Sequence, residues 1–209
     1  MNASSSSSGT PEHSADGPRH FRRLAIYCGS SSSVDPVYLE AAREVGRELA
    51  RRGIGVVYGG GRVGLMGQVA DGALETGGEV IGVITDKLVG FEVGHTGLTE
   101  RYVVPTMHAR KTMMAELADG FIALPGGLGT FEELFEAATW TQLNDHLKPV
   151  GLLDIAGYWD HLIAFLDHAK ATRFIRPQHA SIIQHDVALA GLLHKMATCE
   201  LPIVGTWKP

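Results

Sequence analysis

The stretch IGVVYGGGRVG, residues 54–64, is the most informative segment of this 209-residue chain. Its first five residues form a short apolar run of the kind that makes a buried strand, and three glycines follow directly. A helical pattern begins near Leu65 and ends at Gly77-Gly78, ahead of another apolar run at 80–84. Because parallel strands need a crossover connection between them, this order predicts a parallel sheet with glycine-rich loops.

The same alternation continues on both sides of this segment. Apolar runs predict further strands at 24–28, 102–104, 121–124 and 150–153. Helices are predicted from Asp35-Pro36 onward, at about 106–118, from the loop at 125–130 to about 143, and over 158–171 and 187–197. Residues 86–100 lack a clear period and are predicted to be a long loop. The pattern is typical of an α/β fold, here a Rossmann-like doubly wound parallel sheet with helices on both faces.

Length and composition narrow the class of protein. Residues 1–20 are rich in Ser, Gly and Pro, so we expect a disordered tail followed by one domain over 21–209. A net charge of −5 argues against binding nucleic acid by bulk electrostatics. Cys28 and Cys199 are too few for a disulfide framework. No apolar run is long enough to span a membrane and no signal-peptide pattern is present, so we expect a cytoplasmic protein.

The triple glycine is a candidate anion site. It lies between a strand and a helix, where backbone N–H groups, including those of Gly60 and Gly61, are able to converge on an anion. GGGRVG also fits the dinucleotide pattern G-x-G-x-x-G, and Asp86 stands at the end of the next strand, where a ribose-binding acid belongs. An NAD site is therefore one alternative, although the motif follows the second strand and not the first. A tight turn without a ligand is another alternative.

A second glycine loop, PGGLGT at 125–130, also follows a strand and opens a helix. Its glycines let the backbone approach a ligand, and Thr130 is able to bond a phosphate oxygen at the start of the helix. Two such loops at one sheet edge would suit a nucleoside monophosphate or a sugar phosphate. The competing interpretation is a capping box, in which Glu133 bonds the backbone N–H of Thr130.

The helix preceding that loop begins with MHARK, residues 107–111. Arg110 and Lys111 are strong partners for phosphate or carboxylate, although such pairs are often only solvated surface charges. Here they lie near the start of a helix, where the dipole opposes a cation, which hints at an anionic ligand. In parallel sheets ligands bind outside the carboxyl ends of the strands, so both glycine loops and these two cations are predicted to share one edge.

Taken in order, GGGRVGLMG, MHARK and PGGLGTFEE resemble the Lonely Guy (LOG) family of cytokinin riboside 5′-monophosphate phosphoribohydrolases. The resemblance runs from about Leu24 to the strand at 150–153 and more weakly through the C-terminal helices. It implies a nucleotide-binding catalytic domain that hydrolyses the N-glycosidic bond of cytokinin riboside 5′-monophosphates and of AMP. The products are the free adenine-type base and ribose 5-phosphate.

The resemblance also implies roles for particular residues. The family's catalytic arginine falls on Arg110 and its catalytic glutamate on Glu133. Its substrate contacts fall on Glu92, Lys111, Gly127, Leu128, Gly129, Thr130, Phe131, Glu132 and Thr139. Around Glu92 the segment FEVGHTGLTERY departs from the plant form but keeps the acid, which leaves the base specificity open. Family members are commonly homodimers, and apolar residues on the helix after Thr130 offer a surface for a partner.

The chemistry agrees with these roles. Breaking a ribosyl C–N bond builds positive charge on the sugar, and a carboxylate beside the ring stabilises that charge. We expect no metal and no cofactor, since there is neither HExxH nor a Cys/His cluster. Related proteins have been labelled lysine decarboxylases, but no lysine here is a convincing pyridoxal phosphate partner. A non-catalytic nucleotide sensor and an NAD-dependent enzyme remain as alternatives.

Overall fold

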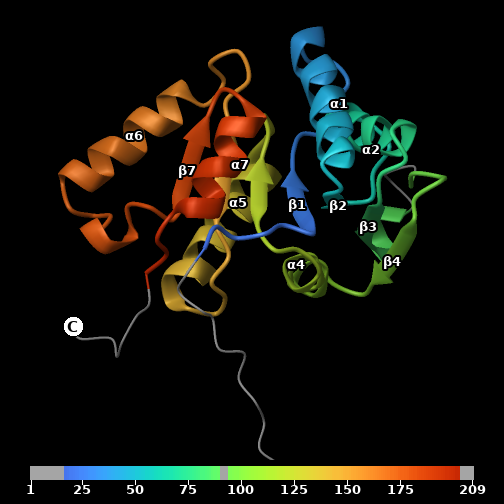
Figure 1. The fold of residues 1–209 in the computed structure, drawn as a ribbon. Coiled ribbons are helices and arrows are strands. Elements are labelled where there is room, and N and C mark those ends of the chain that lie inside the picture. The colour runs from blue at the N-terminus through green and yellow to red at the C-terminus, as the bar shows by residue number, and fades with distance from the viewer. Residues whose placement is uncertain (1–16, 90–93, 203–209) are drawn as a thin grey trace, which may run out of the picture.

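The computed structural model describes residues 17–89 and 94–202, which form a seven-stranded, all-parallel sheet (Figure 1). The spatial order of the strands is β4-β3-β2-β1-β5-β6-β7. The strands are β1 (Arg23–Tyr27), β2 (Gly55–Tyr58), β3 (Val80–Thr85), β4 (Glu100–Val104), β5 (Phe121–Ala123), β6 (Val150–Leu153) and β7 (Ile183–Asp186). The predicted α/β parallel fold is confirmed.

Helices cover both faces of this sheet. The helices are α1 (Pro36–Arg51), α2 (Gly64–Glu75), α3 (Asp86–Val89), α4 (Met107–Leu117), α5 (Leu128–Leu143), α6 (Asp160–Ala171) and α7 (Leu189–Thr198), with a short 3-10 helix η1 (Pro177–His179). One hydrophobic core lies under α1, α2 and α7, and a second lies under α4, α5 and α6. Buried strand residues point alternately into the two cores, as in Leu24 and Ala25. The continuous apolar strands of the sequence follow from this two-sided burial.

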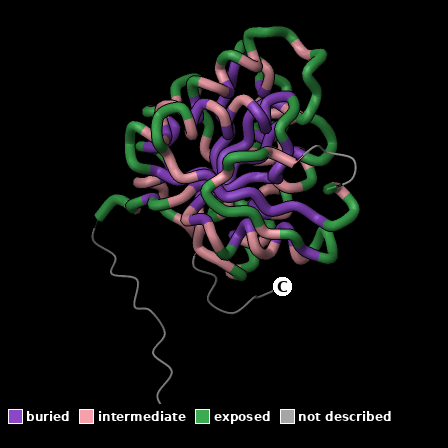
Figure 2. Tube along the Cα trace, turned by 90° about the vertical axis from the view of Figure 1, so that its right-hand side faces the viewer, coloured by how far each residue is buried: buried purple, intermediate pink, exposed green. Residues whose placement is uncertain are grey.

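The burial pattern explains which elements the sequence predicted well. The tube in Figure 2 is buried along the central strands and exposed along the outer loops. The helix start at Asp35-Pro36 is confirmed, since the Asp35 side chain accepts a hydrogen bond from Val37 N at 3.0 Å. Strand β7 was missed because it is an edge strand without a buried residue in its IQHD sequence. The predicted loop at 86–100 was partly wrong, because it contains α3 and the first residue of β4.

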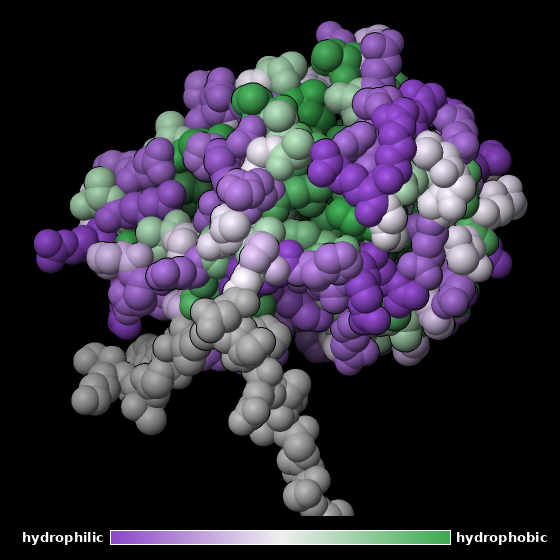
Figure 3. Space-filling view, viewed as in Figure 1, coloured by the Kyte–Doolittle hydropathy of each residue, from purple (hydrophilic) through white to green (hydrophobic). Residues whose placement is uncertain are grey.

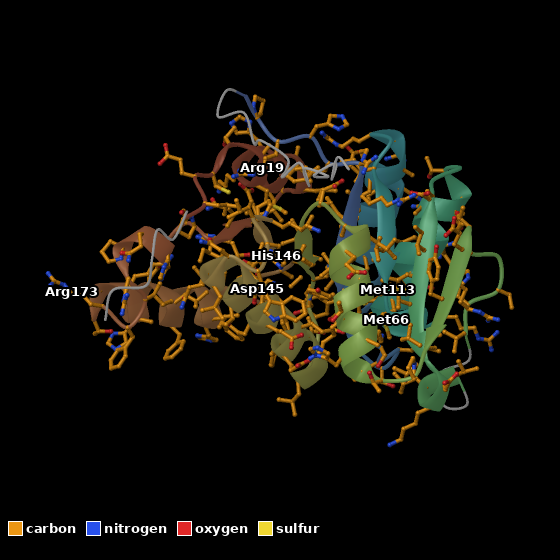
Figure 4. All side chains as sticks on the ribbon, turned by 90° about the horizontal axis from the view of Figure 1, so that it is seen from below. Arg19, Met66, Met113, Asp145, His146 and Arg173 are labelled. Atoms are coloured by element: carbon orange, nitrogen blue, oxygen red, sulfur yellow. The ribbon has the colours of Figure 1, made fainter. Side chains whose placement is uncertain are left out.

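Most of the predicted N-terminal tail, residues 1–16, lies outside the described part of the chain, as do residues 90–93 and 203–209. Arg19, within the predicted tail, is tied to the end of α7 (Figure 4): its backbone N–H donates to Ala197 O at 2.8 Å and its guanidinium to Cys199 O at 2.6 Å. Over the described ranges, no helix is both long enough and apolar enough to cross a membrane.

The strand order reverses at β1, which has β2 on one side and β5 on the other. Chain connections on the two sides of such a switch point run in opposite directions, so the loops after β1 and β5 leave a crevice between them. The loop after β5 holds the PGG of the PGGLGT segment, residues 125–127, and the loop after β1 contains Cys28 and Gly29. The topology therefore selects the second glycine loop, and not the triple glycine, as the centre of a ligand site.

Candidate functional site

A nearly buried ion pair lies at this edge of the sheet. Arg110 on α4 and Glu133 on α5 meet with 3.3 Å between Nη1 and Oε1, and their side chains are only 8% and 13% exposed. Arg110 is held on other sides as well, since its Nε donates to Val83 O at 2.9 Å and its Nη1 approaches Met107 Sδ at 3.3 Å. The structure thus brings together the two residues to which the resemblance assigns catalysis.

Burial sets the ionisation of Glu133. Removal from water raises the pKa of this carboxyl to about 7, against an ordinary value of 4.5. The positive charges of Arg110 and Lys111 pull the pKa down, while Glu132 and Glu136 push it up, so burial prevails over the cation nearest to it. A carboxyl with this pKa exchanges protons near neutral pH, which is the property of a general acid or base.

The first turn of α5 supplies N–H groups beside this pair. The helix begins at Leu128, and its N-cap, Gly127, has no side chain to bond the free N–H groups of the first turn. The capping-box interpretation of Thr130 and Glu133 is therefore wrong, because the helix begins two residues before Thr130. With Leu128 85% exposed, the start of α5 is open to an anion.

The start of α4 was predicted correctly. Thr106 is the N-cap, and its side chain accepts a hydrogen bond from Ala109 N at 3.1 Å. This cap begins the helix directly after β4, so that Arg110 and Lys111 fall on the side of α4 that is buried. Both are less than 10% exposed, which excludes the interpretation of these two cations as solvated surface charges.

The triple glycine makes room for Arg110. A Cβ on Gly59 would lie 2.0 Å from Arg110 Nη2, so only glycine leaves space for the guanidinium there. Gly60 has a φ of +79° and its carbonyl accepts from His95 N at 3.1 Å, while Gly61 forms a β-bridge with Gly94. Gly60 and Gly61 are buried, and their assignment to substrate binding stays a prediction.

Two hydrogen bonds hold the loop between β5 and α5, residues 125–127, which we call the PGG loop. The Gly29 N–H after β1 donates to Pro125 O at 3.0 Å, and the Tyr158 hydroxyl donates to Gly126 O. Gly126 itself packs against Thr130, since a Cβ at this position would lie 2.1 Å from Thr130 Oγ1. The sequence did not single out Tyr158, and it singled out Gly59 only as part of the triple glycine and not for its contact with Arg110, because both contacts join residues distant in the chain.

The other predicted substrate contacts, Lys111, Glu132, Thr139 and Glu92, do not all lie beside Glu133 in the described structure. Lys111 Nζ lies 2.5 Å from Glu132 Oε1 and 2.9 Å from Glu136 Oε2. Glu136 was not predicted, although its position four residues after Glu132 puts both on one face of α5. Thr139 lies on a different side of α5 from Glu133, where it lines a groove against α6. Glu92 falls outside the described residues.

Three cavities of the described residues are lined by neither Arg110 nor Glu133. Figure 3 shows apolar side chains gathered in the middle of one face, and a cavity of about 720 Å³ between α1 and α7 is lined largely by apolar residues. Asp145 and His146 follow the end of α5 (Figure 4), where burial lowers the pKa of His146 to about 4. Within residues 17–89 and 94–202, no group of three His, Cys, Asp or Glu side chains is arranged to hold a metal ion.

Comparison with solved structures supports the fold. The chain superposes on the molybdenum cofactor carrier protein of Chlamydomonas reinhardtii with a TM-score of 0.61, over 83% of this chain and 94% of that one. Sequence identity with that protein is 22%, so this likeness concerns the fold alone.

Sequence comparison is more specific. Residues 66–196 match the family model described as "Possible lysine decarboxylase". A cytokinin riboside 5′-monophosphate phosphoribohydrolase of Arabidopsis thaliana, LOG7, is 49% identical over 163 residues, which are 78% of this chain and 75% of that protein. The enzyme LOG of Oryza sativa subsp. japonica is 48% identical over 78% of this chain and 67% of its own length. The chain therefore belongs to the LOG family of cytokinin riboside 5′-monophosphate phosphoribohydrolases.

Proposed function

We propose that this protein hydrolyses the N-glycosidic bond of cytokinin riboside 5′-monophosphates and of AMP, releasing the adenine-type base and ribose 5-phosphate. The observation that carries the proposal is the nearly buried Arg110–Glu133 pair beside the open start of α5. The relatives named above support the same reaction, since their names state it. The proposal includes the predicted cytoplasmic location, which cell fractionation would check.

The substrate phosphate binds at the start of α5. N–H groups from Gly127 to Thr130 face the anion, and the positive end of the helix dipole favours it. This places the ribose further along the first turns of α5, toward Glu133. Binding energy from the phosphate then orients the ribose against the carboxylate, so a nucleoside without phosphate loses turnover as well as affinity.

Glu133 and Arg110 act on the reacting atoms. The bond from the ribosyl carbon to the base nitrogen breaks, its electron pair leaves with the base, and the Glu133 carboxylate stabilises the oxocarbenium-like sugar. A water oxygen then bonds to the ribosyl carbon, and one water proton passes to Glu133. Arg110 orients the substrate and assists departure of the base, which takes up a proton from solvent, and Glu133 returns its proton to solvent afterwards. A Glu133 pKa of about 7 allows the carboxyl to accept that proton and to release it again.

Base release from matched substrates tests this function. Purified protein is incubated with AMP, isopentenyladenosine monophosphate and adenosine, and free base is measured. Both monophosphates should be hydrolysed, and adenosine should be nearly untouched. Equal turnover of adenosine and AMP would overturn the phosphate-anchored mechanism. Saturable nucleotide binding without base release would favour the nucleotide-sensor alternative, and tight binding of NAD would favour the dinucleotide alternative.

We also propose a homodimer that uses the groove between α5 and α6. Leu134 and Ala138 are buried in the core, but Phe135 on the same helix is 39% exposed and lines a groove of about 450 Å³ with Phe165 and Phe174. A second copy would cover these rings, which are 63% and 90% exposed in one chain. Light scattering should give twice the chain mass, and Phe135→Glu should give a monomer.

A further inference from the structure

The PGG loop is held through its carbonyl groups by donors from other parts of the chain. Gly29 N donates to Pro125 O at 3.0 Å, and the Tyr158 hydroxyl donates to Gly126 O. Gly29 belongs to the loop after β1, whereas Tyr158 follows β6 and lies just before α6. Of these two donors Tyr158 is the side chain, so its hydrogen bond can be removed by a substitution that leaves the backbone unchanged.

The bond from Tyr158 fixes the direction of the peptide group between Gly126 and Gly127. The peptide bonds of the described residues are trans, and in a trans peptide the C=O and the N–H point in opposite directions. The Gly127 N–H therefore points away from the Tyr158 hydroxyl. Gly127 is the N-cap of α5, so this N–H lies beside the free N–H groups of the first helical turn.

Tyr158 is presented by a tight and strained turn. Its N–H donates to Ile155 O at 3.1 Å, and the two residues between them, Ala156 and Gly157, have φ values of +53° and +72°. A left-handed φ is unfavourable for alanine, and such strain persists only where the surrounding structure imposes it. The chain thus keeps a strained turn at the point from which Tyr158 reaches the PGG loop.

Neighbouring groups also hold the ring of Tyr158. Its centroid lies 5.8 Å from that of Tyr38 on α1 and 4.8 Å from that of Trp159, and both contacts are edge to face. Trp159 is buried, and its backbone N–H donates to the buried Asp154 carboxylate at 2.8 Å. Because the turn and both rings hold Tyr158, its hydroxyl is a fixed donor for Gly126 O.

We propose that Tyr158 is a positioning residue for the substrate phosphate: its hydroxyl holds the peptide between Gly126 and Gly127 so that the Gly127 N–H faces the anion. This rests on the function proposed above, which places the phosphate at the start of α5. Without the hydroxyl the peptide gains freedom to rotate, and ordering it again on binding lowers the affinity for phosphate. Tyr158 acts through the loop backbone and not on the ribosyl carbon, so the chemical step should be preserved.

Ligand binding to Tyr158→Phe tests the proposal, since this variant keeps the ring and removes only the hydroxyl. By calorimetry, the Kd for ribose 5-phosphate should rise about three- to tenfold, as for one lost neutral hydrogen bond. The Kd for adenosine, which has no phosphate, should stay unchanged. Tyr38→Phe is the matched control, because it removes the hydroxyl of the neighbouring ring and keeps the bond to Gly126, and it should leave both values unchanged. Equal weakening of both ligands in Tyr158→Phe, or no change in either, would overturn the proposal.

Amide NMR tests the direction of the Gly127 N–H. In protein labelled with heavy nitrogen at glycine, the Gly127 signal is assigned by its loss in Gly127→Ala, where a new methyl group would meet nothing within 4 Å. Inorganic phosphate should shift this signal in the wild type and should require a higher concentration to do so in Tyr158→Phe. A Gly127 signal that does not respond to phosphate would contradict the assigned direction.

Kinetics with AMP separate positioning from a purely structural role. In Tyr158→Phe we expect KM to rise about three- to tenfold with kcat nearly unchanged, and Tyr38→Phe should match the wild type. A lower melting temperature with unchanged KM, or a fall in kcat alone, would overturn the proposal. Should the wild type bind ribose 5-phosphate but release no base, the proposed function fails and the two titrations still judge Tyr158. Should the wild type bind no ribose 5-phosphate, both proposals fail.

Discussion

Two of the arginine–glutamate pairs in this molecule have opposite effects on the pKa of the glutamate. On the outer surface of α1, Arg51 lies 2.7 Å from Glu44, and the two side chains are 51% and 55% exposed. At the contact between α4 and α5, Arg110 lies 3.3 Å from Glu133, and both side chains are nearly buried. Hydrogen bonds from Arg51 and Arg47 lower the pKa of Glu44, whereas burial raises that of Glu133 to about 7.

This difference shows that the exposure of a carboxyl to water, more than the identity of its partner, sets its pKa. Glu44 keeps its hydration and gains two arginines, so its charged form is favoured. Glu133 loses its hydration and receives one long contact from an arginine that also bonds Val83 O. A surface pair of this kind adds little to the free energy of unfolding. In the nearly buried pair, Glu133 gains or loses its proton near neutral pH.

Glu133→Gln is expected to have the largest effect. A neutral amide neither stabilises an oxocarbenium ion nor accepts a proton from water, so turnover should fall roughly 10²–10⁴-fold while nucleotide still binds. Glu44→Gln is the matched control on the surface and should keep full turnover. Base release and nucleotide titration on both variants measure this. Near-normal turnover in Glu133→Gln would remove the carboxylate from the mechanism.

Arg110→Lys should be nearly as damaging although the charge is kept. Lysine lacks the planar fork that bonds Val83 O and Glu133 together, so we expect turnover to fall roughly 10²–10³-fold, as for a lost preorganised donor. Arg51→Lys on α1 should leave turnover unchanged, because its contacts are exposed. The comparison of the two arginines would break down if both variants kept their activity.

The pH dependence of stability should differ in sign between the two regions. The folded protein holds the Glu133 proton up to a pKa of about 7, against 4.5 ordinarily, so stability should fall as pH rises between these values, by at most about 3 kcal/mol. Glu44 has a lowered pKa, so its contribution is present above the ordinary value and is lost as pH falls below it. Denaturant unfolding from pH 4 to 8 should show the fall in the wild type and a flatter profile in Glu133→Gln.

Two glycine substitutions should give the smallest effects and separate activity from stability. In Gly59→Ala the new methyl group meets the Arg110 guanidinium, and displacing it should lower turnover by about tenfold. In Gly72→Ala the methyl group would lie 2.0 Å from the Arg43 carbonyl oxygen on α1, so stability should fall by about 1–3 kcal/mol with normal turnover per folded molecule. Melting curves and base release on both variants check this, and equal loss of turnover would contradict it.

Much of the candidate site could be predicted because its signals are local. The Thr106 cap places Arg110 in the first turn of α4, and the residues before Leu128 are glycines that open α5. What could not be predicted depends on contacts between distant segments. The space that Gly59 leaves for Arg110 and the hydrogen bond from Tyr158 to the PGG loop join residues on different elements. Strand β7 was missed because its sequence, IQHD, contains a single apolar residue.

The sequence by itself determined the α/β class, the parallel sheet and the edge at which the glycine loops gather, because strand and helix periods and loop residues are local properties of the chain. The tertiary structure alone decided that Glu133 carries a pKa of about 7 and that Lys111 binds Glu132 and Glu136. Both depend on how far water is excluded between α4 and α5. That exclusion arises only when α4 and α5, which are joined through β5, pack on the same face of the sheet.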